Sequence, residues 1–237
     1  MLKKIFNVKN LLRFILFSFI ASIMYIAVRI ILAPTVASVS DITVRVKSDY
    51  VLMLLQCCLG LLAMLFPNFL KRMVNLDIPS VMLIMYAVFL YCAIYLGEVR
   101  NFYYTVPHWD TILHTFSGAA LGTLGFSLVS LLNKSKSLHL SLSPVFVALF
   151  AFCFAVSLGV VWEIYEFAAD SFLHTNMQKF ALENGEQLLG RAALADTMKD
   201  LIVDVIGAFT ASVIGFISLK YKKGWNGWLG RFRIKSK

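Results

Sequence analysis

Residues 144–170 read PVFVALFAFCFAVSLGVVWEIYEFAAD, and this stretch decides the class of the protein. Residues 144–162 carry no charge, and about 20 such residues are enough to cross the ~30 Å hydrocarbon core of a bilayer. Three acidic residues, Glu163, Glu166 and Asp170, then follow within and at the edge of the same apolar run. The stretch therefore predicts a membrane-spanning helix that carries carboxylates at one end.

The rest of the chain has the same character. Hydrophobic residues make up 59% and charged residues 15%, and the mean hydropathy is +0.78, far above that of an ordinary globular domain. We predict an all-α fold, a polytopic transmembrane helical bundle that forms a single domain over residues 1–237. The six predicted spans are residues 11–33, 50–70, 79–97, 109–133, 143–169 and 195–219, with a loop at 171–194.

The first span has a second interpretation, a cleavable signal peptide. Lys3, Lys4 and Lys9 would form its charged start, and Thr35-Val36-Ala37 would offer small residues for cleavage. The apolar run is longer than the usual core of a signal peptide, so we expect an uncleaved helix.

The distribution of charge predicts the orientation. If the N-terminus is cytoplasmic, 15 of the 22 basic residues lie on the inner side and 12 of the 13 acidic residues lie in the outer half. This asymmetry follows the positive-inside rule, so we predict that both ends of the chain are inside. The basic excess then reflects membrane orientation and anionic lipid rather than nucleic acid, and we expect the protein in the bacterial cytoplasmic (inner) membrane as a multi-pass protein.

Eight ionisable residues recur at helical spacing in or beside the last three spans. They are Asp110 and His114; Glu163, Glu166 and Asp170; and Asp196, Asp200 and Asp204. Intervals of three and four place each group on one helix face. The predicted topology brings all three groups to the outer side, so we expect one shared polar site, since unpaired carboxylates in a bilayer cost ~2.5–3.5 kcal/mol each.

This residue set has several chemical interpretations. Carboxylates with one imidazole suit a divalent metal, Mg²⁺, Mn²⁺, Ca²⁺ or Zn²⁺. We predict that Glu163, Asp170, Asp196, Asp200 and Asp204 bind the metal. We assign general acid–base catalysis to His114, with Asp110 and Glu166 beside it.

Two alternatives to the metal stay open. One is a proton relay in which some carboxylates stay protonated. The other is pairing with a cation such as Arg29, which lies near the outer end of the first span. The loop at 171–194 is long enough to cover the site, and Arg191 and Gln178, with Arg29, are its candidate substrate-binding residues.

Three motifs resemble those of a known family. They are His108-Trp109-Asp110-x-x-Leu113-His114, Trp162-Glu163-x-x-Glu166-x-x-x-Asp170 and Asp196-Thr197-Met198-x-Asp200-x-x-x-Asp204-x-x-Gly207-Ala208. Together they resemble the YjdF-like bacterial inner-membrane proteins, a family of unassigned function, and more loosely the VanZ-like proteins associated with glycopeptide resistance. The VanZ pattern tends to show Glu-x-x-Gln and Asn where this chain has Glu163-x-x-Glu166 and Asp204.

Three functions fit this pattern. The first is a metal-dependent hydrolase or transferase that acts on a membrane lipid or lipid-linked envelope substrate, with no nucleic-acid partner. The second is a non-catalytic envelope or resistance factor of the VanZ-like type, whose polar core only fixes helix packing. The third is an ion-coupled transporter, although no internal repeat is visible in the sequence.

Overall fold

The computed structural model describes residues 8–35, 45–73, 76–132, 142–173, 175–182, 186–221, 228–232 and 234–236. Within these residues the protein is almost entirely helical, which confirms the predicted all-α class. Six helices are long and apolar enough to cross a membrane. The chain is therefore a multi-pass membrane protein.

The long helices begin and end close to the predicted spans. They are α1 (Val8–Leu32), α2 (Lys47–Met73), α3 (Ser80–Leu90) with its direct continuation η2 (Tyr91–Val99), α5 (Trp109–Leu132), α6 (Pro144–Leu173) and α7 (Arg191–Lys220). The short elements are α4 (Phe102–Thr105), η3 (Trp228–Phe232) and the two antiparallel strands β1 (Leu76–Asp77) and β2 (Lys235–Ser236).

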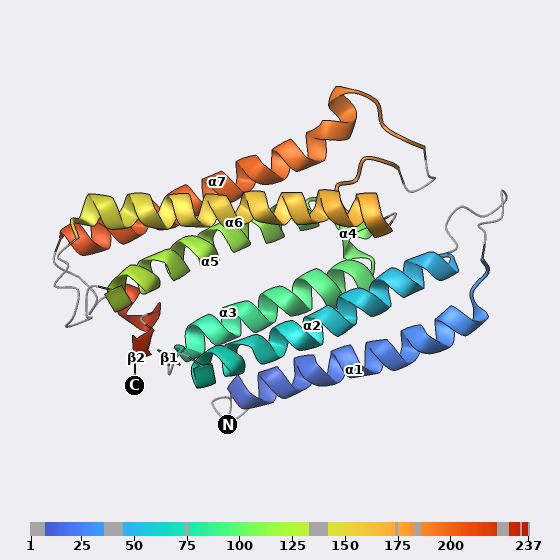
Figure 1. The fold of residues 1–237 in the computed structure, drawn as a ribbon, viewed down its shortest axis with the longest axis horizontal. Coiled ribbons are helices and arrows are strands. Elements are labelled where there is room, and N and C mark those ends of the chain that lie inside the picture. Colours follow the sequence, from blue (N-terminus) through green and yellow to red (C-terminus); the bar gives the residue numbers. More distant parts are fainter. Residues whose placement is uncertain are drawn as a thin grey trace.

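The helices form two groups of three (Figure 1). Helices α1, α2 and α3 lie together, and α5, α6 and α7 form a second group in which α5 packs against both of the others. The start of α1 and strand β2 lie at the same end of the molecule, as an even number of spans requires. The opposite end carries α4 and is called the outer end below. Its side of the membrane stays a prediction.

The outward faces of the helices are apolar, as a lipid environment requires. Phe17, Ile31 and Phe167 are among the exposed large hydrophobic side chains, whereas the buried faces of α5 and α7 carry many small residues. The four cysteines are free thiols. Cys57 is buried, whereas Cys58 and Cys153 are exposed.

Helices α5 and α7 approach each other closely at Gly118. A Cβ atom there would collide with the backbone carbonyl of Asp204. Helix α6 presents a second glycine to the same residue, since a Cβ on Gly159 would lie 2.6 Å from Asp204 Oδ2. Asp204 therefore packs between α5 and α6, and it fits there because Gly118 and Gly159 have no side chains.

Candidate functional site

The candidate site lies where the outer halves of α5, α6 and α7 meet. Asp200 and Asp204 from α7, Glu163 and Glu166 from α6, and His114 from α5 are all buried. Asp110 lies one turn outward from His114 and is half-buried. The structure thus brings together the three groups that helical spacing predicted.

His114 is held between two carboxylates. Its Nδ1 lies 3.3 Å from Asp204 Oδ2, and its Nε2 lies 3.6 Å from Asp110 Oδ1. Asp204 also accepts a hydrogen bond from Ser117 Oγ at 3.2 Å. A histidine with a carboxylate on one ring nitrogen has a fixed tautomer and orientation, an arrangement common behind metal-binding histidines.

Asp110, His114 and Asp200 form a group of potential metal ligands. One ligand atom from each residue lies within 4.8 Å of the others. The group differs in part from the predicted metal set, because Asp110 and His114 join Asp200. Asp204 lies behind the imidazole.

Two buried acids have oxygens without a hydrogen-bond partner of ordinary geometry among the described residues. They are both carboxylate oxygens of Glu163 and Oδ1 of Asp200. Glu163 does interact with Thr197 and, electrostatically, with His114 and Asp204. Buried polar atoms are rarely left unpaired, so these oxygens point to a ligand or ion.

Lys179 closes the site from the loop between α6 and α7. Its ammonium contacts the Asp110 carboxylate and lies 3.4 Å from Asp196 Oδ2. Burial disfavours the charged form, but Asp110 and Asp196 outweigh it and raise the pKa of Lys179 above its ordinary value. The backbone of Lys179 has φ = 48°, an uncommon conformation for a residue with a side chain. Lys179 therefore neutralises part of the site.

Asp170 organises this loop. Its carboxylate accepts hydrogen bonds from Thr175 Oγ1, from the Met177 N–H at 2.7 Å and from the Gln178 N–H at 2.9 Å. Gln178 in turn donates to Thr197 Oγ1 on α7 at 3.0 Å. These contacts place Lys179 over Asp110. The sequence pattern predicts that Asp170 binds the metal and Gln178 the substrate, whereas in the structure both residues hold the loop in position.

The remaining predicted residues fall in different places. Glu166 lies at the cavity wall and accepts a hydrogen bond from Trp162 Nε1 at 3.0 Å. Arg191 is the exposed first residue of α7. Arg29 lies apart from the acids, because it donates to Tyr50 Oη at 3.0 Å within the α1–α2 pair.

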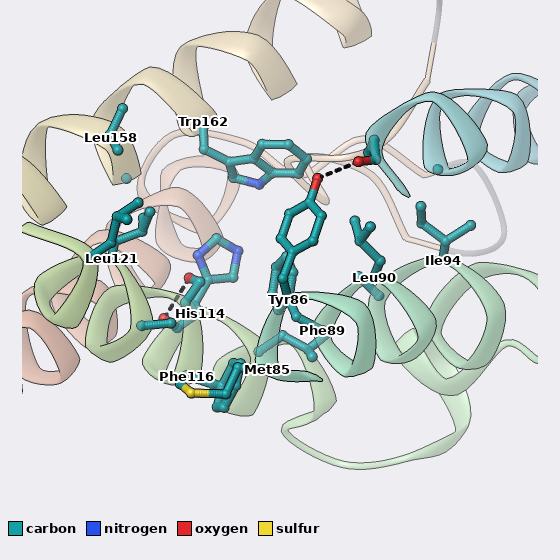
Figure 2. A pocket seen from close by; sticks show the side chains of 18 of the residues that line it. Met85, Tyr86, Phe89, Leu90, Ile94, His114, Phe116, Leu121, Leu158 and Trp162 are labelled. Carbon is teal, nitrogen blue, oxygen red and sulfur yellow. Dashed lines mark hydrogen bonds between the residues drawn. The ribbon is translucent and has the colours of Figure 1, made fainter. Parts of the chain in front are cut away.

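A cavity of about 800 Å³ lies between the two groups of helices and reaches the site. In Figure 2, His114 and Trp162 face this pocket from one side, and Tyr86, Phe89 and Leu90 of α3 face it from the other. Most of the wall is apolar. The site is therefore the polar end of a hydrophobic cavity, a combination typical of ligand pockets.

Glu98 is a polar residue of this cavity that sequence reasoning did not single out. It lies in η2, a π-helix, and accepts a hydrogen bond from Gln56 Nε2 at 3.1 Å. Arg45 fixes the same turn by donating to the Glu98 carbonyl at 3.1 Å and to Asn101 Oδ1 at 2.6 Å. Tyr103, also on the wall, has its pKa raised well above the ordinary value by burial and by Glu98, so it stays neutral.

Residues 11–221 match the protein family described as "Predicted membrane protein (DUF2238)". The chain belongs to this family. An uncharacterized protein of Thermotoga maritima is 34% identical over 149 residues, which cover 62% of this chain and 68% of the relative. No solved structure matches.

Membership of the DUF2238 family agrees with the YjdF-like resemblance at the level of a membrane-protein family. The VanZ-like resemblance receives no support from these comparisons. Neither the family description nor the relative assigns a reaction, so function must be argued from the site.

Proposed function

We propose that this DUF2238 protein is a divalent-metal-dependent hydrolase or transferase that acts on a membrane lipid or lipid-linked substrate. The observation that carries the proposal is the group of Asp110, His114 and Asp200, whose ligand atoms lie within 4.8 Å of one another. Asp110 and His114 of this group also line the apolar cavity.

The donor set favours a particular range of metals. Carboxylates suit Mg²⁺, Ca²⁺ and Mn²⁺, whereas imidazole suits Zn²⁺ and other transition metals. Two carboxylates and one imidazole therefore favour Mn²⁺ or Zn²⁺. His114 would bind through Nε2, because Nδ1 faces Asp204.

The charge of the site supports a bound cation. Five acidic residues, Asp110, Glu163, Glu166, Asp200 and Asp204, lie within a few helical turns of one another. Lys179 is the cation that contacts this group from the described part of the loop, and it lies beside Asp110 rather than beside the deeper acids. A divalent ion would offset the surplus negative charge at depth.

The residues supply the parts of a hydrolytic reaction. A metal ion lowers the pKa of bound water and polarises a phosphoryl or carbonyl oxygen. Glu163 would accept the proton of the attacking water, because it is a buried carboxylate that interacts electrostatically with His114 and has no hydrogen bond of ordinary geometry among the described residues. The water oxygen bonds to phosphorus or carbonyl carbon, the bond to the leaving oxygen breaks, and Glu163 passes the proton to that oxygen. In a group-transfer reaction, an alcohol takes the place of water as the nucleophile.

This proposal changes the roles expected from the sequence. His114 and Asp110 become metal ligands, Asp204 orients His114, and Glu163 replaces His114 as the general base. Glu166, which the Trp162 indole contacts, is a candidate for binding the head group of the substrate.

The test begins with elemental analysis of the purified protein in detergent. We expect about one Mn²⁺ or Zn²⁺ per chain, with loss of metal in Asp200→Asn and in His114→Ala. Asp77→Asn is the matched control, since this exposed acid pairs with Lys71 at 3.2 Å outside the site. Vesicles that contain the wild type and a total lipid extract should then show a metal-dependent change in lipid composition.

Three results would contradict the proposal in different ways. Absence of metal from the wild type, together with unchanged melting on addition of Mn²⁺ or Zn²⁺, would exclude the metal site. Lower melting temperatures in both variants of a metal-free protein would favour a structural role for the acids. Ion uptake into vesicles without any lipid product would favour a transporter.

A further inference from the structure

The cavity runs nearly the full thickness of the membrane. Glu98, Tyr103 and Lys179 line it at the outer end, whereas Leu70, Ile78 and Phe232 line it at the other. On α5, the lining residues extend from Asp110 to Leu128. Eighteen steps at 1.5 Å per residue correspond to about 27 Å, close to the ~30 Å of the hydrocarbon core.

The chemistry of the wall changes along this length. Among the described residues that line the cavity, those that can carry a charge lie in its outer part: Glu98, Asp110, His114, Glu166, Lys179 and Asp204. The inner part is lined mainly by leucine, methionine, phenylalanine and other apolar side chains. A ligand that satisfies both ends has a polar head and one long hydrocarbon chain.

The length of the cavity distinguishes between classes of lipid. The acyl chains of a phospholipid occupy one leaflet, about half of the ~30 Å core. They would leave the inner half of this cavity empty. We infer that the cavity holds the single chain of a polyisoprenoid lipid, whose head group reaches the metal-binding group. This inference rests on the proposed function, because it names the substrate class of the same site.

The inner end of the cavity is lined by residues near the end of the described chain. Phe232 and Ile234 are buried and line the cavity, and the Phe232 carbonyl accepts a hydrogen bond from Ser127 Oγ of α5. Strand β2 continues this segment and pairs with β1. Phe232 and Ile234 would therefore contact the far end of a chain that fills the cavity.

The test measures lipid binding rather than turnover. The purified full-length protein is titrated, in detergent and with metal removed by a chelator, with a long-chain polyprenyl phosphate, a short-chain polyprenyl phosphate and phosphatidylglycerol. Native mass spectrometry measures the bound fraction. We expect the long chain to bind at least tenfold more tightly than the short chain, and phosphatidylglycerol not to displace it.

Two variants test whether the lipid chain lies in the cavity. Leu124→Trp fills the inner half of the cavity and should weaken binding of the long chain at least tenfold, whereas Leu149→Trp, on the exposed face of α6, should bind like the wild type. Ala120→Phe places a ring in the same wall, nearer the midpoint of the cavity, and replaces Leu124→Trp if that variant does not fold.

The outcomes separate this inference from the proposed function. Equal affinity for the two chain lengths, displacement by phosphatidylglycerol, or wild-type binding in the folded blocking variant would overturn the inference. Long-chain binding by a protein that takes up no metal would support the inference while the proposed enzyme activity fails. Loss of metal but retention of chain binding in Asp200→Asn would support both.

Discussion

His114 on α5 and Asp204 on α7 are ninety positions apart in sequence, yet Nδ1 and Oδ2 lie 3.3 Å apart. This contact joins two spans across the core of the second helix group, and Ser117 supports it with a hydrogen bond to the other oxygen of Asp204. Metal affinity and stability of the site should therefore depend on this pair and on the groups around it.

Replacement of Asp204 by Asn should weaken metal binding without abolishing it. The amide keeps nearly the same shape but removes the negative charge that orients His114. Loss of such an outer carboxylate typically costs about 10–100-fold in metal affinity. Isothermal titration with Mn²⁺ and Zn²⁺ measures the change, and Asp77→Asn is the control. Unchanged affinity in Asp204→Asn would mean that His114 is not a ligand.

Gly159→Ala should disturb the same contact from the third helix. The new Cβ would lie 2.6 Å from Asp204 Oδ2, so the carboxylate must move. Overpacking of this kind costs about 1–3 kcal/mol, and we expect a lower melting temperature and weaker metal binding. Gly122→Ala is the control, since its nearest neighbour is the Ala211 Cβ at 3.2 Å, away from the acids. Equal effects of the two substitutions would show that only helix packing is involved.

Lys179→Met should reduce stability most at neutral pH. The folded protein raises the pKa of Lys179 above its ordinary value of 10.5, so the stabilisation is fully present below pH 10.5 and is lost as the pH rises through the folded-state pKa. The difference in melting temperature between Lys179→Met and the wild type should therefore shrink above about pH 10.5. Lys179→Arg keeps the charge and should show a smaller difference at neutral pH. A difference that does not change with pH would exclude the ion pairs as its cause.

Asp170→Asn should loosen the loop over the site. The carboxylate accepts three hydrogen bonds from Thr175, Met177 and Gln178, and each bond to a charged group contributes about 1.5–3 kcal/mol. We expect faster hydrogen exchange at the Met177 and Gln178 amides and faster proteolysis of the loop. Exchange in α2 should not change and provides the internal control. Unaltered protection of Met177 and Gln178 would contradict this role of Asp170.

Two substitutions of Glu98 should show how much its hydrogen bond with Gln56 contributes to stability, apart from its charge. Glu98→Gln can still accept the hydrogen bond from Gln56 Nε2, whereas Glu98→Leu leaves that donor without its partner. An unsatisfied buried group costs about 1–3 kcal/mol, so Glu98→Leu should melt at a clearly lower temperature than Glu98→Gln. Restoration of the melting temperature in the double variant Gln56→Leu/Glu98→Leu would assign the loss to this bond. Equal melting of the two single variants would contradict it.

The sequence was sufficient for the spans and for most of the site. Long apolar runs fix the spans, and carboxylates three or four residues apart share a helix face whatever the fold. Lys179 and Glu98 were not singled out because their positions depend on features without periodicity. Lys179 reaches the site through a turn held by Asp170, and Glu98 lies in a π-helix, whose wider turn changes the face that each residue occupies.

The partner of Arg29 illustrates the same limit. An arginine near the outer end of a span among many acids suggested an ion pair with them. Instead Tyr50 of α2 accepts its hydrogen bond at 3.0 Å, and the guanidinium lies over the tyrosine ring. Only the grouping of α1 with α2 decides this, and the sequence pattern contains no signal for that grouping.

The contact between His114 and Asp204 also constrains the order of biosynthesis. Helix α5 has the lowest mean hydropathy of the six spans in its most apolar window, 1.5, and it carries both Asp110 and His114. Its main polar partners are on α7, which the ribosome makes only after α6. During synthesis, α5 must therefore enter the bilayer with Asp110 and His114 paired only with each other, and Asp204 can stabilise it there only after α7 is made.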